Sequence, residues 1–268
     1  MSQAAAAAIV NEPLLLRSDA GGVATLTLNR PKQYNALSEA MLNALLGELK
    51  QIGEDESVRV VVLAGAGKAF CAGHDLKEMR ATPKQDYYQR LFELCAEMMQ
   101  TVTRIPQPVI ARVHGIATAA GCQLVAQCDL AVASSEARFA TSGINVGLFC
   151  STPAVSLSRN VPRKRAFEML VTGDFIDAET ASDWGLINEV AAPDQLDAAV
   201  AKLAQKVVDK SAVAVTAGKR LLYSQLEKGL SGAYAEAAHV MACNMMAEDV
   251  AEGIDAFSQK RHPHWKHR

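Results

Sequence analysis

The chain has 268 residues, 50% apolar and 21% charged, so it can bury a full hydrophobic core as one domain or as one domain with an appendage. Its 27 lysines and arginines are balanced by 29 acidic residues, which excludes an overall positive field of the kind that attracts nucleic acid or a membrane surface. No apolar stretch reaches transmembrane length. We therefore expect a soluble globular protein with no membrane partner.

Cysteine usage and the chain start bear on the compartment. No CxxC pair or other metal-ligand spacing occurs, and several cysteines lie in apolar stretches, which favours a reducing compartment and predicts no metal site. The opening MSQAAAAAIVNEP lacks a basic n-region and a cleavage site, so we expect no secretory signal. These features predict a cytoplasmic protein. The cysteines are Cys71, Cys95, Cys122, Cys128, Cys150 and Cys243.

The first elements are β-structure followed by a helix. Gly21-Gly22 separates the alternating runs PLLLRSD and VATLTLN, which predicts a hairpin or two paired strands. Ser38 is a suitable N-cap for the helix that follows. The apolar residues of this helix recur at helical spacing: they are Met41, Leu42, Leu45, Leu49 and Ile52.

Three later runs predict strands that are buried on both faces. VRVVVLAG (58–65) is nearly all apolar, and PVIARVHG (108–115) and DLAVAS (129–134) have the same character. Loops of small residues follow the first two, and the second loop leads into GCQLVAQC, which we expect to be a helix. Strands alternating with helices predict an α/β fold, and the repetition of strand, loop and helix indicates a spiral of similar units.

After residue 160 the strand signals fade and helices follow one another, at 162–172, 177–184, 194–209, 212–227 and 232–259. Gly173 and Gly185 end the first two. We place a boundary near 188–194, between a core of residues 1–192 and a helical C-terminal region of residues 193–268. One continuous domain is the alternative.

The loops 69–79 and 114–129 are the candidates for chemistry. Each delivers small residues to the C-terminal end of a strand, where backbone N–H groups can approach a ligand. Two convergent N–H groups would form an oxyanion hole, and the helix after the second loop would add its N-terminal positive charge beside a developing enolate. Tight packing of helix on strand is the alternative explanation for either loop alone.

These loops contain motifs that resemble those of the crotonases, the enoyl-CoA hydratase/isomerase superfamily. AFCAGHDLKEM is similar to the family signature AFxAGxDLKEM, HGIATAAGCQLVAQCD to GxxxGGGxxLxxxCD, and NRPKQYNAL (29–37) to NRPxxxNAL. The segment VTGDFIDAETASDWGLINEV also matches the later TGxxxxAxxAxxxGLVxxV. The resemblance covers the chain from about residue 23. It implies the α/β crotonase (ClpP-like) fold, a spiral of repeated ββα units with a helical C-terminal region.

The resemblance also implies roles for residues of the first two motifs. The backbone N–H groups of His74 and Ala120 would hold the thioester oxygen of an acyl-CoA. Ala72, Asp75 and Leu76 would lie along the path of the adenine and pantetheine. Coenzyme A is then part of the substrate, and we expect no tightly bound cofactor.

Further CoA contacts are implied outside these loops. Lys32 and Lys77 would lie near the CoA phosphates. Phe257 and Lys260 belong to a C-terminal segment that completes the CoA site in the family, often that of a neighbouring subunit. Simple solvation is the alternative for each lysine.

The chain departs from the family at the two carboxylates with which its hydratases move protons. Gln123 occupies the first position, and an amide neither accepts a proton usefully near neutral pH nor cycles between acid and base forms. Gly143 occupies the second and has no side chain. Because positioned acid–base groups each contribute roughly 10²–10⁴-fold, we expect weak or altered hydratase activity.

Few residues are candidates to replace those carboxylates. His74 titrates near physiological pH unless perturbed, but its side chain can also point away from the thioester. Cys150 lies where related naphthoate synthases have an aspartate, and a small hydrophobic packing residue is the alternative. Asn145, Ser151 and Thr152 could bind a substrate hydroxyl or a water. The residues for which packing or structural hydrogen bonding is the simpler explanation are Cys71, Cys122 and Asp129.

Three functions remain open from the sequence. The first is an enzyme of fatty acid metabolism that stabilises the enolate of an acyl-CoA, a lyase or isomerase by the resemblance, with hydratase, isomerase, hydrolase or carbon–carbon chemistry open. The second is a non-catalytic acyl-CoA-binding protein. The third is RNA binding, which is known for one crotonase relative; the clusters Arg163-Lys164-Arg165 and KRHPHWKHR permit it, but we do not expect a nucleic-acid partner. The resemblance further implies a homotrimer or hexamer assembled through the C-terminal region.

Overall fold

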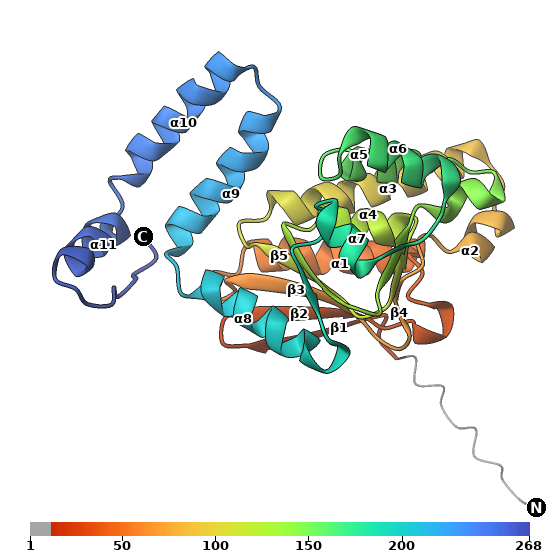
Figure 1. The fold of residues 1–268 in the computed structure, drawn as a ribbon, viewed down its shortest axis with the longest axis horizontal. Helices are drawn as coiled ribbons and strands as arrows, with labels where there is room; N and C mark the ends of the chain where they lie inside the picture. The colour runs from red at the N-terminus through yellow and green to blue at the C-terminus, as the bar shows by residue number, and fades with distance from the viewer. Residues whose placement is uncertain (1–11) are drawn as a thin grey trace, which may run out of the picture.

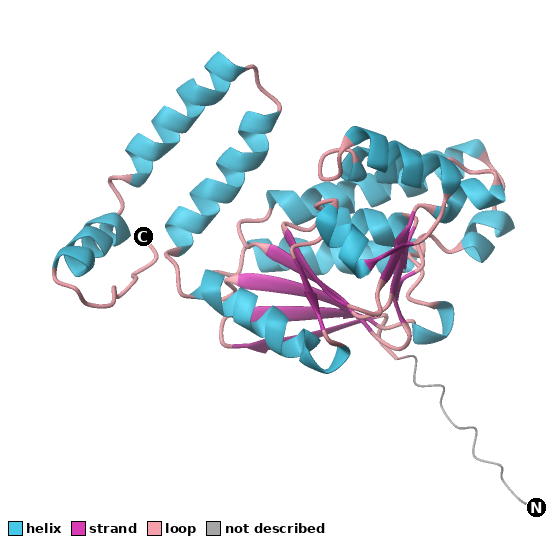
Figure 2. Ribbon diagram, viewed as in Figure 1, coloured by secondary structure: helices cyan, strands magenta, loops and turns pink. Residues whose placement is uncertain are grey.

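Two mainly parallel β-sheets form the centre of the molecule, here a computed structural model that describes residues 12–268 (Figures 1 and 2). The opening segment, for which no secretory signal is expected, lies largely outside these residues. The larger sheet has the order β1-β2-β3-β5-β7-β10: β1 Leu15–Ala20, β2 Val23–Leu28, β3 Val60–Gly65, β5 Val109–Val113, β7 Leu130–Ser134 and β10 Glu189–Ala191. The smaller has the order β4-β6-β8-β9: β4 Ala69–Cys71, β6 Ile116–Thr118, β8 Arg138–Ala140 and β9 Ile176–Asp177.

The chain winds between these sheets as a spiral, which confirms the predicted fold class. Each turn places one strand in the larger sheet and the next strand in the smaller sheet, and then continues into helix: β3 and β4, β5 and β6, β7 and β8. β3, β5 and β7 are parallel neighbours, and so are β4, β6 and β8. The repeated unit is therefore ββα.

The helices cover both faces of the larger sheet. Along β3, Val61 and Leu63 point into the main core with α1 and α3, whereas Val60 and Val62 point to a second apolar cluster under α8, as the period of two in a strand requires. The helices are α1 Glu39–Gly53, α2 Leu76–Ala81, α3 Gln85–Arg104, α4 Ala120–Gln127, α5 Ser151–Leu157, α6 Arg163–Thr172, α7 Ala178–Asp183, α8 Leu196–Val208, α9 Ala212–Leu226, α10 Leu230–Asn244 and α11 Glu248–Ser258.

Local sequence signals explain the first elements. Gly21 and Gly22 have φ of 56° and 79° and form the two-residue turn of the β1–β2 hairpin, whose strands pair from Ala20↔Val23 outward. The Ser38 hydroxyl accepts the N–H of Met41 at 3.2 Å and caps α1. Both sequence-based predictions are confirmed.

Two predictions about the C-terminal half are wrong in detail. The expected helix over 232–259 is two helices, α10 and α11, because Ala247 has extended backbone (φ −68°, ψ 142°) and the chain bends there. Strands also continue after residue 160, since β9 adds to the smaller sheet and β10 to the edge of the larger one. Both strands are too short to show a periodic pattern.

The three last helices form an arm that extends from the body (Figure 1). No residue of α10 is buried, whereas α8 packs on the larger sheet. The division at residue 192 stays a sequence-based prediction. Within residues 12–268, no helix combines the length and apolar character that a membrane span needs.

Candidate active site

The two motif loops meet at one end of the smaller sheet. Because β4 and β6 are parallel neighbours, Cys71 opposite Ala117, the loops that follow them lie side by side. A methyl group built on Gly121 would lie 2.1 Å from the carbonyl oxygen of Cys71, so only glycine fits there. A methyl group on Gly73, which has a φ of 92°, would lie 3.2 Å from the backbone nitrogen of Ala120.

Two backbone N–H groups at this junction have no acceptor in the described chain. The neighbouring bonds, from Leu37 N to the Gly73 carbonyl and from Asp75 N to the Leu37 carbonyl, use the groups on either side of His74 and leave the N–H of His74 itself unpaired. Ala120 is the first residue of α4, where helical N–H groups lack intrahelical partners. Within residues 12–268 neither N–H donates a hydrogen bond. Such a pair of free donors suits an oxygen that carries negative charge.

The backbone of Ala119 is strained, and its conformation sets the shape of the second loop. Its φ of 51° and ψ of −120° fall in a region that favours glycine, and its N–H bonds to the Ala140 carbonyl at 3.0 Å. The same backbone reversal starts α4 at Ala120. The strain therefore lies next to one of the two free donors.

His74 and Ala120, the residues that carry the two donors, both line a cavity of about 250 Å³. Its wall is mainly apolar, and among the described residues no carboxylate lines it. The lining residues are Ala72, His74, Leu76, Met79, Phe92, Ala119, Ala120, Ser142, Gly143, Val146, Leu148, Phe149, Cys150, Ser151, Thr152 and Pro153.

His74 lines this cavity, and both nitrogens of its imidazole ring are shielded from solvent. Its ring is edge-on to Phe92, with centroids 5.4 Å apart and planes at 72°. Burial lowers the pKa of His74 to about 4, and the nearby Leu37 backbone offsets only part of this shift. Neither ring nitrogen has a hydrogen-bond partner among the described residues. The side chain is therefore neutral near pH 7 and a weak base.

Gly143 lies on the cavity wall but cannot be extended into a carboxylate. A methyl group there would lie 2.6 Å from the Leu148 carbonyl oxygen and 2.8 Å from the Cys150 sulfur. The Cys150 thiol thus occupies the space that a side chain at 143 would need. Burial raises the pKa of this thiol, which argues against a thiolate nucleophile. Gln123, 4% exposed on α4, is not among the lining residues.

Some of the residues predicted from the sequence to contact CoA line the cavity, and others lie at the surface. Ala72 and Leu76 line the cavity, and Leu76 is 55% exposed at its rim. Asp75 instead caps α2 by accepting the N–H groups that follow it, and pairs with Arg30 at 2.9 Å. Burial alone would raise the pKa of Asp75, but Arg30 and the two N–H groups outweigh it and lower the pKa. Its visible role is to fix the loop.

The four remaining CoA candidates do not meet the cavity within one chain. Lys32 and Lys77 are exposed on the first 3₁₀ turn and on α2. Phe257, 87% exposed, and Lys260 lie at the end of α11, and Figure 1 places α11 at the opposite end of the molecule from α2.

Only some of the remaining candidates line the cavity. Ser151 and Thr152 line the cavity, whereas the amide of Asn145 is turned to the Gly173 carbonyl at 3.5 Å. Cys71 and Cys122 are fully buried, and burial raises the pKa of each to about 12. The packing interpretation of these two thiols agrees with this burial.

Asp129 holds the arm to the core. It accepts hydrogen bonds from Val109 N (2.6 Å), Lys219 Nζ (2.7 Å) and the Tyr223 hydroxyl (2.8 Å). Lys219 is 7% exposed and also donates to the carbonyls of Val102 and Gln107, while burial lowers its pKa against the opposing effect of Asp129. Lys219 and Tyr223 were missed by the sequence analysis, because lysine and tyrosine on a helix carry no signal for a partner some 90 residues earlier.

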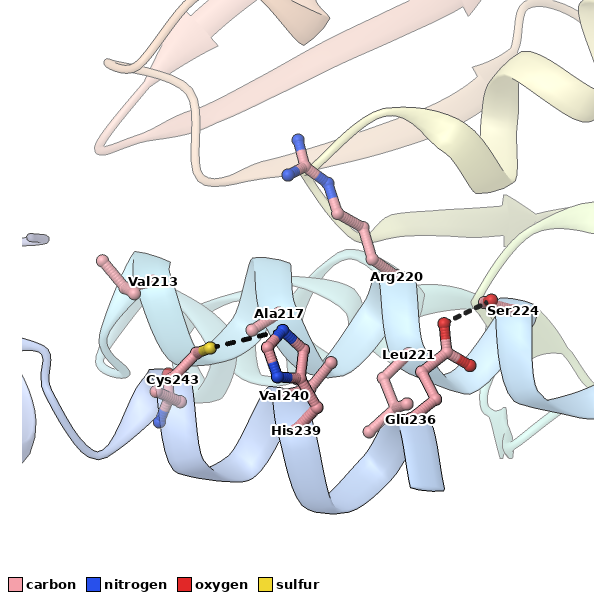
Figure 3. A pocket seen from close by; sticks show the side chains of 10 residues that line it. Val213, Ala217, Arg220, Leu221, Ser224, Glu236, His239, Val240 and Cys243 are labelled. Carbon is pink, nitrogen blue, oxygen red and sulfur yellow. Dashed lines mark hydrogen bonds between the residues drawn. The ribbon is translucent and has the colours of Figure 1, made fainter. Parts of the chain in front are cut away.

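A second hollow lies between α9 and α10, where the Ser224 hydroxyl donates to Glu236 at 2.8 Å and Cys243 lies 3.6 Å from His239 (Figure 3). None of the predicted site residues lines it. We therefore place the candidate active site at the junction of the two loops.

The basic clusters engage their own chain. Arg165 stacks over Trp184 at 4.8 Å and pairs with Glu168. In the tail, Arg261 binds Glu252 through both of its terminal nitrogens. Part of each positive cluster is thus already neutralised.

The fold is a spiral of ββα units, and two free N–H groups belong to residues that line an apolar cavity. These features define a class of protein, which comparison with known proteins identifies. The family model described as enoyl-CoA hydratase/isomerase matches residues 18–268, and the chain belongs to that family. It is 46% identical over 246 residues to the rat mitochondrial enoyl-CoA hydratase domain-containing protein 3, covering 92% of this chain and 82% of the relative.

Similar solved structures support the same family assignment. An enoyl-CoA hydratase from Mycobacterium smegmatis is 61% identical, with a TM-score of 0.94 over 95% of this chain and 99% of the other. Human enoyl-CoA hydratase domain-containing protein 3 is 42% identical, with a TM-score of 0.92 over 94% and 100%. The cytoplasmic location predicted from the sequence is contradicted by the relatives from rat, mouse, frog and human, which are named mitochondrial. Cysteine usage and the chain start could not distinguish these compartments.

Proposed function

We propose that the protein binds acyl-CoA thioesters and polarises their carbonyl group, with the N–H groups of His74 and Ala120 as an oxyanion hole. The observation that carries this proposal is the pair of unpaired N–H groups beside a mainly apolar cavity. Buried N–H groups normally find an acceptor, so a carbonyl oxygen supplied by a ligand is a natural partner. The first turn of α4 adds its partial positive charge to the field on that oxygen.

The same cavity supports only weak hydratase chemistry. Hydration needs a group that takes a proton from water and a group that delivers one to the α-carbon. No carboxylate among the described residues lines the cavity, the neutral His74 is a weak base, and the Cys150 thiol is held protonated by its raised pKa. We therefore propose that turnover of enoyl thioesters is at least about 100-fold below that of a hydratase with both glutamates.

A non-catalytic acyl-CoA-binding protein is the second candidate. The crowding of Gly143 by Leu148 and Cys150 favours it, because the second glutamate cannot be restored there without moving the backbone. Both candidates share the thioester site and differ only in whether protons are transferred on the bound acyl group.

Assembly would complete the site. The exposed apolar residues of the arm, which we propose to bury in a homotrimer or hexamer, include Leu222, Leu226, Leu230, Tyr234, Met241 and Met246. In such an assembly Phe257 and Lys260 of one subunit would reach the CoA of another. Lys32, exposed on the 3₁₀ turn before α1, and Lys77, exposed on α2, would attract its phosphates.

Calorimetry and two assays separate these possibilities. We expect butyryl-CoA to bind more tightly than free coenzyme A, because only the thioester fills the cavity and meets the two N–H groups. Exchange of the α-protons of butyryl-CoA in D2O then reports enolate formation, and hydration of crotonyl-CoA reports acid–base turnover. Binding without exchange or hydration supports the non-catalytic candidate, and equal binding of butyryl-CoA and coenzyme A contradicts both.

A further inference from the structure

A thiol and an imidazole lie side by side on the arm, apart from the cavity between the two loops. His239 and Cys243 are one turn apart on α10, and the Nε2 atom of His239 lies 3.6 Å from the Cys243 sulfur. Both residues are exposed, and both line the hollow between α9 and α10 (Figure 3). Neither residue takes part in the proposed function.

The geometry of this pair matches that of two ligands on one metal ion. Tetrahedral zinc bonds of about 2.1 Å to nitrogen and about 2.3 Å to sulfur place the two ligand atoms about 3.6 Å apart. Residues at positions i and i+4 share one face of a helix, which is how helical histidine pairs hold zinc. The same separation suits a hydrogen bond between the thiol and the ring. A metal ion would therefore replace a shared proton without moving either side chain far.

The surroundings of the pair favour a cation. Cys243 lies in the last turn of α10, and the carbonyl end of a helix carries partial negative charge. Arg220 is a positive side chain among those that line the hollow, but its guanidinium points away from the pair (Figure 3). Glu236, on the same face of α10, is already engaged by Ser224 at 2.8 Å and Lys228 at 3.1 Å. It therefore offers no third ligand.

The ligand set selects the kind of ion. A thiolate sulfur and an imidazole nitrogen suit Zn²⁺ and similar ions, whereas Mg²⁺ and Ca²⁺ prefer oxygen ligands. Within residues 12–268, no group of three histidine, cysteine or acidic side chains could hold a metal ion. Water would fill the other coordination positions, for which the hollow of about 530 Å³ has room. The sequence predicted no metal site because a single pair one turn apart is not among the usual zinc spacings.

We propose that His239 and Cys243 bind Zn²⁺ or a similar divalent transition-metal ion on the arm, with water in the remaining coordination positions. Binding replaces the S–H bond of Cys243 with a metal–sulfur bond and releases one proton to solvent. The ion joins two residues of a helix that has no buried residue. It therefore stabilises a helix that has little support from packing.

Titration of the full-length protein with Co²⁺, a spectroscopic substitute for Zn²⁺, tests the inference. We expect a sulfur-to-cobalt charge-transfer band in the near ultraviolet, which Zn²⁺ abolishes by competition and Mg²⁺ does not. Cys243→Ser should abolish the band, and His239→Gln should weaken Co²⁺ binding at least about tenfold, the factor that corresponds to 1.4 kcal/mol. The band reports on Cys243 because the other cysteines are buried: Cys71, Cys95, Cys122, Cys128 and Cys150.

Two controls separate this site from adventitious binding at the chain end. His262→Gln and His264→Gln each remove an exposed imidazole of the tail and should leave the band unchanged. If Cys243→Ser fails to fold by circular dichroism, alkylation of the exposed thiol in the wild type takes its place. Absence of the band, its survival without a free Cys243 thiol, or equal Co²⁺ affinity of the wild type and His239→Gln overturns the inference. Butyryl-CoA binding tests the proposed function separately.

Discussion

Acidification should destabilise the protein through His74 in a defined pH window. Its pKa is about 4 in the folded chain against an ordinary value of 6.5, so between these values the unfolded chain binds a proton that the folded chain does not. The free energy of unfolding therefore falls as the pH drops from about 6.5 to about 4, by roughly 1.4 kcal/mol per pH unit and about 3 kcal/mol in all. Below pH 4 both states are protonated and this contribution levels off.

Urea unfolding followed by circular dichroism at a series of pH values measures this effect. Carboxylates also titrate in acid, so the quantity to compare is the difference between the wild type and His74→Gln, which lacks the ionisable ring. The gap between the two proteins should change by about 3 kcal/mol between pH 7 and pH 4, with the variant favoured in acid. Parallel pH profiles would refute the burial of a neutral imidazole at His74.

Three further changes probe the scaffold of the site by the same unfolding assay. Ala119→Gly should stabilise by about 1 kcal/mol, because relief of a strained φ of 51° exceeds the added chain entropy of glycine; destabilisation would contradict the strain. Gly143→Ala should destabilise by about 1–3 kcal/mol through overpacking, whereas Gly218→Ala, which has open space in α9, should not; equal effects would remove the crowding argument. Lys219→Met should destabilise by about 3 kcal/mol, because it leaves the Asp129 carboxylate buried without its ammonium partner, and adding Asp129→Asn should recover part of the loss.

Long apolar runs and local caps made the centre of the fold predictable from the sequence. The buried strands β3, β5 and β7, the Gly21-Gly22 hairpin and the Ser38 cap each depend on neighbouring residues only, and so their signals are local. The strands of the smaller sheet are two or three residues long and show no period. Helix α3 was not assigned at all.

The bend between α10 and α11 shows why non-local contacts escape sequence reasoning. No glycine or proline marks it. Asp249, 2% exposed in the first turn of α11, accepts the backbone N–H groups of Lys266 and His267 from the chain end. The new helix start is therefore fixed by a segment 17 residues further on, which periodicity cannot reveal.

The sequence predicted which two loops form the site, but not the contacts between them or their backbone conformation. The motifs identified both free N–H groups and the loss of both glutamates. They gave no sign that Cys150 fills the space beside Gly143, that Ala119 is strained, or that Asp75 is engaged by Arg30. These facts depend on how separate loops approach one another.

The thioester carbonyl itself gives the most direct test of the central claim. Butyryl-CoA labelled with ¹³C at the carbonyl should show a downfield shift on binding, because two N–H groups draw electron density towards the oxygen. Gly73→Ala, whose methyl group would press on Ala119 at 2.9 Å and spread the loops, should lose the shift. Gly21→Ala, at a positive φ of 56° in open space, should keep it. A bound thioester whose carbonyl resonance is unchanged from solution would contradict the oxyanion hole.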